Sequence, residues 1–507
     1  MIFFKKNILL ILILIIGIFF RTYQLGNNPY GFFCDEASIG YNAYSLLKTG
    51  QDEWGKSWPL FFQAFGEYKS PILTYSTIPF VAVFGLNEFS VRLASAFWGI
   101  ISIYAIYFLA TTFFNKKIGL FSSLFLAISP WHIHLSRVSL EGLMPYLCFT
   151  IFGVTFWVLY VKYFDLKFGI LSSIFLVLAT YSYFPARVFV PILGIIMLLL
   201  SIKSILNKKR HLFILIITTL VLIFPLFYHM FFGPGLSRWE LTKGNGNINS
   251  ILNKYPLYFS YDYLFSKGDI DFNGQLITRH SIRGIGQLFL FQLPLLFFGL
   301  IEIFKHRKSH LIFFTVLFWL FFYPIPDLLT AQTSPYATRS IIGVIPFQII
   351  SALGLVFLIK TFSNYYQKII FCLIFTIIVV ISVFRFFSLF KQYPQYSSDF
   401  WGWQSGPHQI INYFIKNQSL YQQLCIEGQF NAPGIFIKFY DPENKCLDKC
   451  QICDYHMFNP NKKQLFAISR ETYDKLRYQL KFLVLDIIKY PSNEPAFYIG
   501  EINEPIN

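Results

Sequence analysis

Eleven apolar segments, separated by short polar loops, dominate this sequence of 507 residues. A membrane-spanning helix needs about 20 mostly apolar residues, and these segments approach or reach that length. The eleven segments are 8–20, 90–113, 118–131, 142–160, 168–184, 188–200, 212–230, 285–304, 311–328, 341–358 and 369–387. We therefore predict an α-helical polytopic membrane protein with about eleven spanning helices.

The composition supports a lipid environment. Hydrophobic residues make up 55% of the chain and charged residues only 13%, whereas ordinary soluble chains are about 25% charged. The formal net charge of +16 could indicate nucleic-acid binding, but the Lys and Arg residues occupy mainly the short loops between apolar segments. Such loops carry topology information, so membrane lipids rather than nucleic acid are the expected partner.

The first apolar segment follows Lys5 and Lys6 and resembles a secretory signal peptide. The stretch after it, beginning at Arg21, offers no small-residue cleavage site. We interpret this segment as an uncleaved signal anchor.

Basic residues fall on alternate loops, which predicts the orientation. With eleven spans, one side of the membrane receives six basic loops, at 5–6, 116–117, 162–167, 203–210, 305–308 and 360–368. The positive-inside rule makes this side cytoplasmic. The opposite side then carries two long loops, 21–89 and 231–284, and everything after residue 390. We expect a cell-membrane protein whose outer loops and C-terminus are extracytoplasmic.

Two domains are predicted, a membrane domain at 1–390 and a soluble α/β domain at 391–507, where charged residues, Asn, Gln and Pro become common. Alternating patterns at 434–440 and 482–487 predict strands in the second domain. Within the first outer loop, 72–84 is apolar but too short to span, which predicts a helix lying in the membrane interface and ending near Gly85.

Four of the seven cysteines lie in the predicted outer domain, at Cys425, Cys446, Cys450 and Cys453. An even set in an oxidising compartment favours two disulfides, with a zinc site or free thiols as the alternatives; the pairing stays open. His132 and His134 could bind a metal as a pair, but residues two apart point away from each other on a helix. Interfacial or hydrogen-bonding roles are favoured for both.

Several polar residues gather in the outer loops, close to helix ends, where charged groups usually serve function. Asp35 and Glu36 follow the first apolar segment, and Lys69-Ser-Pro-Ile precedes the interfacial segment. Arg92 stands at the start of the second span. Arg137 and Glu141 follow the third, shortly after Ser129-Pro130.

This order of motifs resembles the GT-C glycosyltransferases, in particular the protein-mannosyltransferase and aminoarabinose-transferase branch. The family has a Pro where this chain has Ser70 and a Leu where it has Ile72, and Glu141 stands where relatives often have Asp. The segment 334–340, which includes Arg339, resembles a recurrent segment of bacterial members, and 401–403 does so more weakly. The resemblance covers about the first 360 residues well.

The resemblance implies transfer of a sugar from a polyprenyl-phosphate donor to a lipid, glycan or protein acceptor on the outer face. Asp35 would take the proton from the acceptor, with Glu36 supporting it, and Lys69 would stabilise the charge on the departing lipid phosphate. A single displacement on the sugar carbon implies inversion of its configuration. Glu141 would hold the acceptor or the donor sugar.

Other arginines would contact phosphate or sugar, although each could equally be an interfacial Arg whose head reaches the membrane surface. These residues are Arg92, Arg137, Arg279, Arg283 and Arg339. No complete set of metal ligands is evident, so no cofactor is assigned, although a divalent cation would be compatible with the family.

Two other readings stay open. A transporter or flippase would be expected to show internal repeats and charges near the middle of its spans, whereas the charges here collect on one face. An oligosaccharide ligase or polymerase would need the loop 231–284 to carry its catalytic residues.

Overall fold

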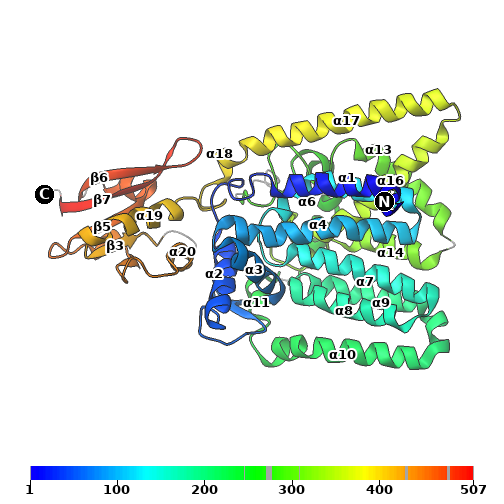
Figure 1. Cartoon of the computed structure of the whole chain (residues 1–507), viewed down its shortest axis with the longest axis horizontal. Helices are drawn as coiled ribbons and strands as arrows, with labels where there is room; N and C mark the ends of the chain where they lie inside the picture. Colours follow the sequence, from blue (N-terminus) through cyan, green and yellow to red (C-terminus); the bar gives the residue numbers. More distant parts are fainter. Residues whose placement is uncertain are drawn as a thin grey trace.

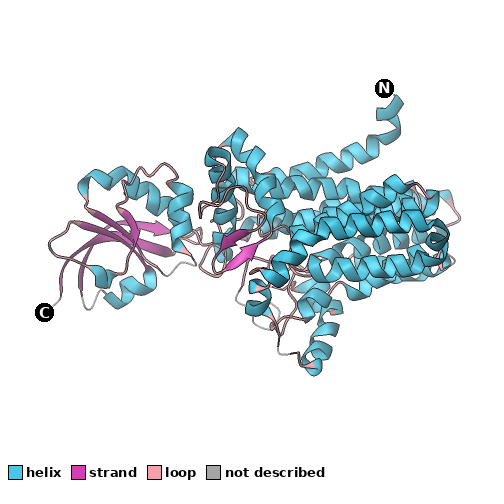
Figure 2. Cartoon of the chain, turned by 90° about the horizontal axis from the view of Figure 1, so that it is seen from below, coloured by secondary structure: helices cyan, strands magenta, loops and turns pink. Residues whose placement is uncertain are grey.

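The computed structural model describes residues 2–244, 246–269, 277–307, 309–428, 432–476 and 480–505. It consists of a bundle of long helices and a smaller domain with a β-sheet at one end (Figures 1 and 2). The N-terminus and the helix connections that carry the basic loops lie at the opposite end of the bundle (Figure 1). The basic loops therefore share one end, and the first outer loop and the C-terminal domain share the other.

Each of the eleven predicted segments contains a helix. The helices are α1 (Ile2–Thr22), α4 (Glu88–Phe113), α5 (Lys116–Ile128), α7 (Leu143–Tyr163), α8 (Leu166–Ser182), α9 (Ala186–Ile205), α10 (Lys209–Phe232), α13 (Gln292–Ile303), α14 (His310–Phe322), α16 (Val344–Thr361) and α17 (Tyr365–Gln392).

The predicted number of spans, about eleven, is larger than the number of helices whose length and composition would let them cross a membrane. Among the described residues, six helices are long and apolar enough to cross a membrane, or seven if α5 and α6 (Pro130–Ser136) count as one span bent by 59°. One of the six, Ala186–Phe232, comprises α9, the 3₁₀ turn η1 (Leu206–Lys208) and α10. Several of the remaining helices are simply short, such as α8 with 17 residues. The fold class, a polytopic helical membrane protein, is confirmed.

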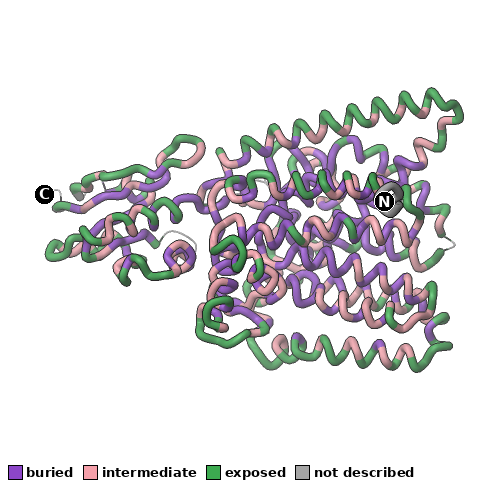
Figure 3. Tube along the Cα trace, viewed as in Figure 1, coloured by how far each residue is buried: buried purple, intermediate pink, exposed green. Residues whose placement is uncertain are grey.

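Burial separates inner from outer helices. In α16 every residue from Val344 to Val356 is buried, whereas α10 buries only Leu215 and Leu226, and α17 only Phe386 and Phe390. Figure 3 shows α10 and α17 as largely exposed helices at the two edges of the bundle. A helix that is apolar all round yet exposed fits a lipid-facing position.

The first outer loop folds into a compact unit beside the bundle. It contains α2 (Cys34–Thr49), the antiparallel hairpin β1 (Phe62–Ala64) and β2 (Glu67–Lys69), and α3 (Pro71–Phe84). Helix α3 confirms the predicted helix at 72–84. It begins at a proline, whose fixed φ suits the first helical position, and ends at Gly85, which has φ +76°.

The second outer loop and the later connections form short elements. They are α11 (Ser237–Thr242), α12 (Ile248–Lys254), η2 (Tyr255–Phe259), the π-helical turn η3 (Asp262–Ser266), η5 (Phe304–His306), α15 (Ile325–Leu328), η6 (Ile341–Gly343) and α18 (Pro394–Ser397).

The C-terminal domain has a five-stranded sheet of order β4-β3-β5-β7-β6. β3 pairs parallel with β4 and β5, and β7 pairs antiparallel with β5 and β6. The strands are β3 (Gln423–Ile426), β4 (Cys450–Ile452), β5 (Gln464–Ser469), β6 (Leu480–Lys489) and β7 (Pro495–Pro505), and the helices are α19 (Pro407–Asn417), η7 (Gln418–Leu420), α20 (Pro433–Tyr440), η8 (Tyr455–Met457) and α21 (Arg470–Leu476).

One of the two predicted strands is wrong. Strand β6 contains 482–487 as predicted, but 434–440 belongs to helix α20. Its buried residues, Ile435, Phe436 and Phe439, have the spacing of one helix face. A short apolar run fits either period, and Pro433 at the helix start was the signal that favoured the helix.

The four outer cysteines form two disulfides, Cys425–Cys453 and Cys446–Cys450, so the favoured alternative is confirmed. The C-terminal domain packs against α2 through α20 (Figure 1). Phe439 lies 4.8 Å from Phe32 between ring centres, and the Lys438 ammonium lies 3.3 Å from the Glu53 carboxylate. The same domain therefore supports the helix that begins with Cys34 and Asp35.

Candidate active site

Asp35 lies in the first turn of α2, at the end of the bundle that faces the C-terminal domain. Its side chain is 19% exposed, and Oδ1 lies 3.3 Å from Nζ of Lys69. Lys69 is the last residue of β2, opposite Phe62 in the hairpin register. Ser70 and Pro71 then turn the chain into α3, so the hairpin and the helix start fix the position of the ammonium group.

Three carboxylates surround the Lys69 ammonium. Besides Asp35, Glu141 lies 3.5 Å away and Glu67 is in direct contact. Glu141 adopts φ +51°, a left-handed conformation that is uncommon outside glycine and occurs at functional sites. The structure thus brings together Asp35, Lys69 and Glu141, which the sequence analysis had selected.

A second cation, Arg238 of α11, belongs to the same cluster and was missed from sequence. One of its terminal nitrogens lies 2.8 Å from the Glu67 carboxylate, and the other lies 3.7 Å from Glu141. Arg238 stands in the second outer loop, 169 residues after Lys69 in the numbering, and no local motif marks it. The only available signal was the presence of a cation on the predicted outer side.

These charges line two adjoining cavities that share Asp35 and Glu141. The smaller cavity, about 10 Å³, is also lined by Asn42, Lys69 and Ser70. The larger, about 80 Å³, is lined in addition by three arginines, one histidine and two tyrosines, namely Arg238, Arg279, Arg339, His280, Tyr183 and Tyr336. The larger cavity is therefore rich in cations, as a site for an anionic group requires.

The charges also set the ionisation of the cluster. Burial alone would raise the pKa of the Asp35 carboxyl, but Lys69, Arg238 and Arg279 outweigh burial and hold this pKa below its ordinary value. Burial would lower the pKa of Lys69, but Asp35, Glu141 and Glu67 raise it above the ordinary value. Both groups are therefore charged at neutral pH.

Glu36, adjacent to Asp35, has a different environment. It is fully buried, and its two carboxylate oxygens accept hydrogen bonds from Arg92 at 3.0 Å each. The backbone N–H of Ser139 donates to the same carboxylate at 2.9 Å. Arg92 also donates to the carbonyls of Pro29 and Gly31. The Glu36–Arg92 pair therefore links three segments of the chain. Neither residue lines either cavity.

Of the other predicted arginines, two line the larger cavity and two lie outside both cavities. Arg339 lines the larger cavity and lies 3.0 Å from Asp327. Arg279 also lines it, with its guanidinium 3.7 Å from the ring centre of Phe33. Arg137 is buried and donates to the backbone carbonyls of Phe20, Tyr23 and Asn28, so it lies outside both cavities. Arg283 stacks on Tyr396 and also lies outside them.

The predicted hydrogen-bonding roles of the two histidines are confirmed. Nδ1 of His132 lies 2.6 Å from Arg21, and its Nε2 lies 2.8 Å from Ser102. Nε2 of His134 lies 2.7 Å from the carbonyl of Arg279. Another histidine, His280, was missed: it lines the larger cavity, with Nδ1 3.3 Å from the buried Asp269 carboxylate.

No group of three or more His, Cys, Asp or Glu side chains in the described ranges is arranged to hold a metal ion. In the cluster, the ammonium of Lys69 already lies among the three carboxylates.

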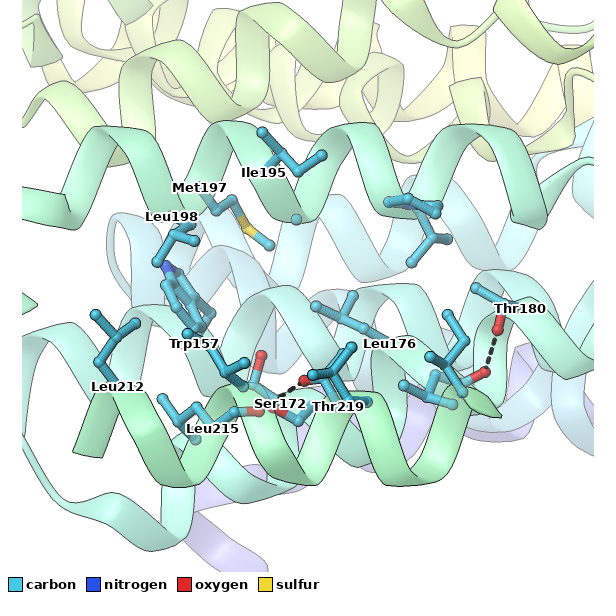
Figure 4. A pocket seen from close by; sticks show the side chains of 18 residues that line it. Trp157, Ser172, Leu176, Thr180, Ile195, Met197, Leu198, Leu212, Leu215 and Thr219 are labelled. Atoms are coloured by element: carbon cyan, nitrogen blue, oxygen red, sulfur yellow. Dashed lines mark hydrogen bonds between the residues drawn. The ribbon is translucent and has the colours of Figure 1, made fainter. Parts of the chain in front are cut away.

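An apolar groove runs along the helices of the bundle. About 310 Å³ of space is enclosed by side chains of α7, α8, α9 and α10, and Figure 4 shows Trp157, Leu176 and Leu198 among them. A second apolar cavity, about 390 Å³, lies between the first outer loop and α10 and is lined by Phe61, Phe224 and His229. Arg187, at the start of α9, stacks over Phe61 and approaches Ser70 next to Lys69. Apolar space therefore extends from the bundle toward the charged cluster.

Comparison with known proteins agrees with this architecture. Residues 68–229 match the family model described as dolichyl-phosphate-mannose-protein mannosyltransferase. The fold is similar to that of ArnT from Cupriavidus metallidurans, solved in the apo state and bound to undecaprenyl phosphate. Each of these structures has a TM-score of 0.57 and 12% identity, with 98% of both chains covered.

The fold is also similar to that of the archaeal oligosaccharyltransferase AglB from Archaeoglobus fulgidus, solved with an inhibitory peptide and a dolichol-phosphate. The TM-score is 0.55 at 11% identity, covering 97% of this chain and 74% of AglB. No curated protein sequence matches significantly. The family match over residues 68–229 and the fold together confirm the resemblance to the GT-C class, and the apolar helices indicate a multi-pass membrane protein.

Proposed function

We propose that this chain, with its GT-C fold and a segment that matches the mannosyltransferase family, transfers a sugar from a polyprenyl-phosphate donor to an acceptor outside the cytoplasm. The observation that carries the proposal is the cluster around Lys69, in which the cations Lys69 and Arg238 and the carboxylates Asp35 and Glu141 line adjoining cavities next to apolar grooves. A lipid-linked sugar has the matching parts: an apolar tail, an anionic phosphate and a polar sugar.

Each part of the donor would bind a different region of the site. Its isoprenoid tail would lie in the apolar space among α7–α10 and beside Phe61 (Figure 4). Its phosphate would approach Lys69 and Arg238, which provide an ammonium and a planar guanidinium for the phosphate oxygens. Arg187, which approaches Ser70, and Arg339, which lines the larger cavity, add positive charge. Glu141 would hold sugar hydroxyls.

Transfer is a single displacement. An acceptor hydroxyl or amine attacks the anomeric carbon, its proton passes to the Asp35 carboxylate, and the bond from that carbon to the phosphate oxygen breaks. Polyprenyl phosphate leaves with the electron pair, and the configuration at the carbon is inverted. Lys69 and Arg238 stabilise the charge that develops on the departing phosphate.

The donor-free cluster also suggests how Asp35 becomes a better base. Without donor, Lys69 and Arg238 are neutralised by Asp35, Glu67 and Glu141, and they hold the pKa of Asp35 low. A donor phosphate that pairs with Lys69 and Arg238 weakens the electrostatic stabilisation that these cations give to the ionised Asp35 carboxylate. Its pKa then rises toward the range in which a carboxylate accepts a proton more readily.

The test is to incubate the purified chain with a panel of radiolabelled polyprenyl-phosphate sugars and to follow release of polyprenyl phosphate. We expect release from at least one donor, and label in an added acceptor fraction. Donor binding with no release from any member of the panel contradicts transfer and favours a transporter or flippase. Turnover only of diphosphate-linked oligosaccharides favours the ligase or polymerase reading.

The orientation is part of this proposal, because it places the cluster outside the cytoplasm. A reporter that is active only outside the cytoplasm should be active when fused after Asn507 and silent when fused at Lys209. The reverse pattern would put the cluster on the cytoplasmic side, and the extracytoplasmic reaction would have to be abandoned.

A further inference from the structure

A cavity of about 620 Å³ lies at the junction between the C-terminal sheet and the segment 399–405, which joins that domain to the bundle. Glu427 follows the parallel strand β3, Ser469 ends the parallel strand β5, and Arg470 and Glu471 follow it. The β6–β7 turn, with Tyr490 and Glu494, closes another side. Open α/β sheets bind ligands at the carboxyl ends of their parallel strands, and this volume suits a small ligand.

Aromatic side chains form an accessible wall of this cavity. Phe400 and Trp401 are 39% and 49% exposed, and their rings meet edge to face with centres 5.2 Å apart. Tyr490 lines the cavity as a third ring. Exposed rings beside polar groups present flat apolar surfaces on which a ligand can stack.

The polar groups in the cavity include acceptors and donors. Asp399, Glu471 and Glu494 supply carboxylates, and burial together with the charges of Asp399 and Glu471 raises the pKa of Tyr490 to about 12. The guanidinium of Arg470, half exposed, is ion-paired with Glu494 and presents its remaining N–H groups as donors.

Gln404 adds a donor without a partner. It is 1% exposed, and its Oε1 accepts a hydrogen bond from the backbone N–H of Cys34 at 3.1 Å, which fixes the orientation of the amide. Its Nε2 has no hydrogen-bond partner within the described part of the chain. A buried donor without a partner is costly, and Gln404 belongs to the lining of the cavity.

We propose that this cavity binds a sugar unit of the acceptor, a proposal that rests on the glycosyl transfer proposed above. Sugar hydroxyls both donate to carboxylates and accept from amide or guanidinium groups, and the C–H face of a sugar ring stacks on aromatic rings. A basic peptide would match only the carboxylates, such as Glu471, whereas the Arg470–Glu494 ion pair offers a ligand both a donor and an acceptor group. The mixed set of donors and acceptors therefore fits a sugar better.

The cavity is connected to the reaction centre. Gln404 binds the backbone of Cys34, the residue directly before Asp35. Arg279, which lines the 80 Å³ cavity with Asp35, donates to the carbonyl of Trp401 at 2.7 Å. A sugar bound beside Trp401 therefore lies next to the segment that holds Asp35, as an acceptor requires.

Saturation-transfer NMR on the full chain in detergent, without donor, tests the proposal with maltotriose, mannotriose and chitotriose as probes. At least one should bind the wild type, and Trp401→Ala should weaken its affinity about tenfold or more through loss of the stacking surface. Trp58→Ala is the matched control, because Trp58 is 60% exposed and lies outside the cavity.

Glu471→Gln, which removes an exposed carboxylate of the cavity, should also weaken sugar binding, whereas the exposed Glu443→Gln elsewhere in the same domain should not. Binding of none of the three sugars, or equal binding by wild type and Trp401→Ala, overturns the proposal. Binding of a trilysine peptide in place of the sugars overturns it in favour of a basic peptide.

Release of polyprenyl phosphate to water, measured without acceptor, separates this proposal from the proposed function. Intact donor hydrolysis without sugar binding rejects only the sugar site. Sugar binding without turnover of any donor rejects the transfer and leaves a sugar-binding cavity whose ligand is not an acceptor.

Discussion

Asp35 and Glu36 are neighbours in one helical turn, but they belong to different kinds of ion pair. Asp35 is partly exposed and shares Lys69 with Glu67 and Glu141 in a cluster that lines two cavities. Glu36 is fully buried and is held in a bidentate pair by Arg92 alone among charged groups of the described chain. Charged groups of the Lys69 cluster are available to a ligand, whereas those of the Glu36–Arg92 pair are not.

Two neighbouring carboxylates of one motif can therefore have different roles. Asp35 lies where it can take part in chemistry, whereas Glu36 stabilises the fold. In the cluster the carboxylates share Lys69 and Arg238, so an incoming phosphate can take the place of one carboxylate beside these cations. In the buried pair every lone-pair direction is directed at Arg92 or at a backbone N–H, and removing either partner leaves an uncompensated charge. We therefore expect mutations in the two regions to alter different measured quantities.

The largest effect is expected in the buried pair. Arg92→Ala leaves Glu36 buried without its partner, and breaking such a pair costs about 3–5 kcal/mol of the free energy of unfolding. Thermal unfolding of the purified protein in detergent measures it, with the exposed Arg210→Ala as the control. A wild-type melting curve for Arg92→Ala would show that the pair does not stabilise the fold.

Lys69→Ala is expected to act mainly on transfer, because Arg238 remains beside Glu67 and Glu141 when the ammonium is removed. Loss of a charge-assisted hydrogen bond to the phosphate is worth roughly 1.5–3 kcal/mol, or about 10- to 150-fold in affinity or rate. Lys69→Arg should retain part of the activity, since the charge remains but the compact ammonium is lost. Donor affinity and single-turnover transfer measure both variants, and wild-type transfer by Lys69→Ala would remove Lys69 from the mechanism.

The smallest effect is expected where the C-terminal domain meets the bundle. Nδ1 of His408 lies 3.1 Å from the Glu88 carboxylate, and this hydrogen bond raises the pKa of His408. A raised pKa in the folded state means that the stabilisation is fully present below the ordinary His pKa, about 6.5, and is lost as pH rises through the raised value.

Because His408 is half exposed, we expect His408→Gln to cost only about 0.2–1 kcal/mol at pH 5.5. The difference from wild type should disappear at pH 9. Thermal unfolding at both pH values measures it, with the exposed His456→Gln as the control. A pH-independent difference would mean that packing, not charge, accounts for the contact.

Much of the architecture could be predicted from the sequence, because apolar length and basic loops are local signals. All eleven apolar segments contain helices, and Asp35, Lys69 and Glu141 come together as their common outer side predicted. The span count differs from eleven mainly because several helices, such as α8 with 17 residues, are short, and the apolar segment 118–131 is also divided by the bend at Ser129–Pro130 into two shorter helices.

The sequence could not separate Asp35 from Glu36. Neighbouring residues on an α-helix point about 100° apart, so one can face a cavity while the other faces the core, and no local signal says which. It also could not place Arg137 on backbone carbonyls or find Arg238, because both depend on contacts between segments far apart in the chain. These assignments needed the tertiary structure.

The most direct test compares Asp35→Asn with Glu36→Gln, measuring single-turnover transfer per folded molecule. If Asp35 is the base, Asp35→Asn should fold and bind donor but transfer about 10²–10⁴-fold more slowly, because an amide cannot accept the acceptor's proton. Glu36→Gln should yield less folded protein, while the folded fraction keeps most of its transfer rate. Full activity in Asp35→Asn, or abolished transfer in well-folded Glu36→Gln, would contradict the division between a chemical cluster and a structural pair.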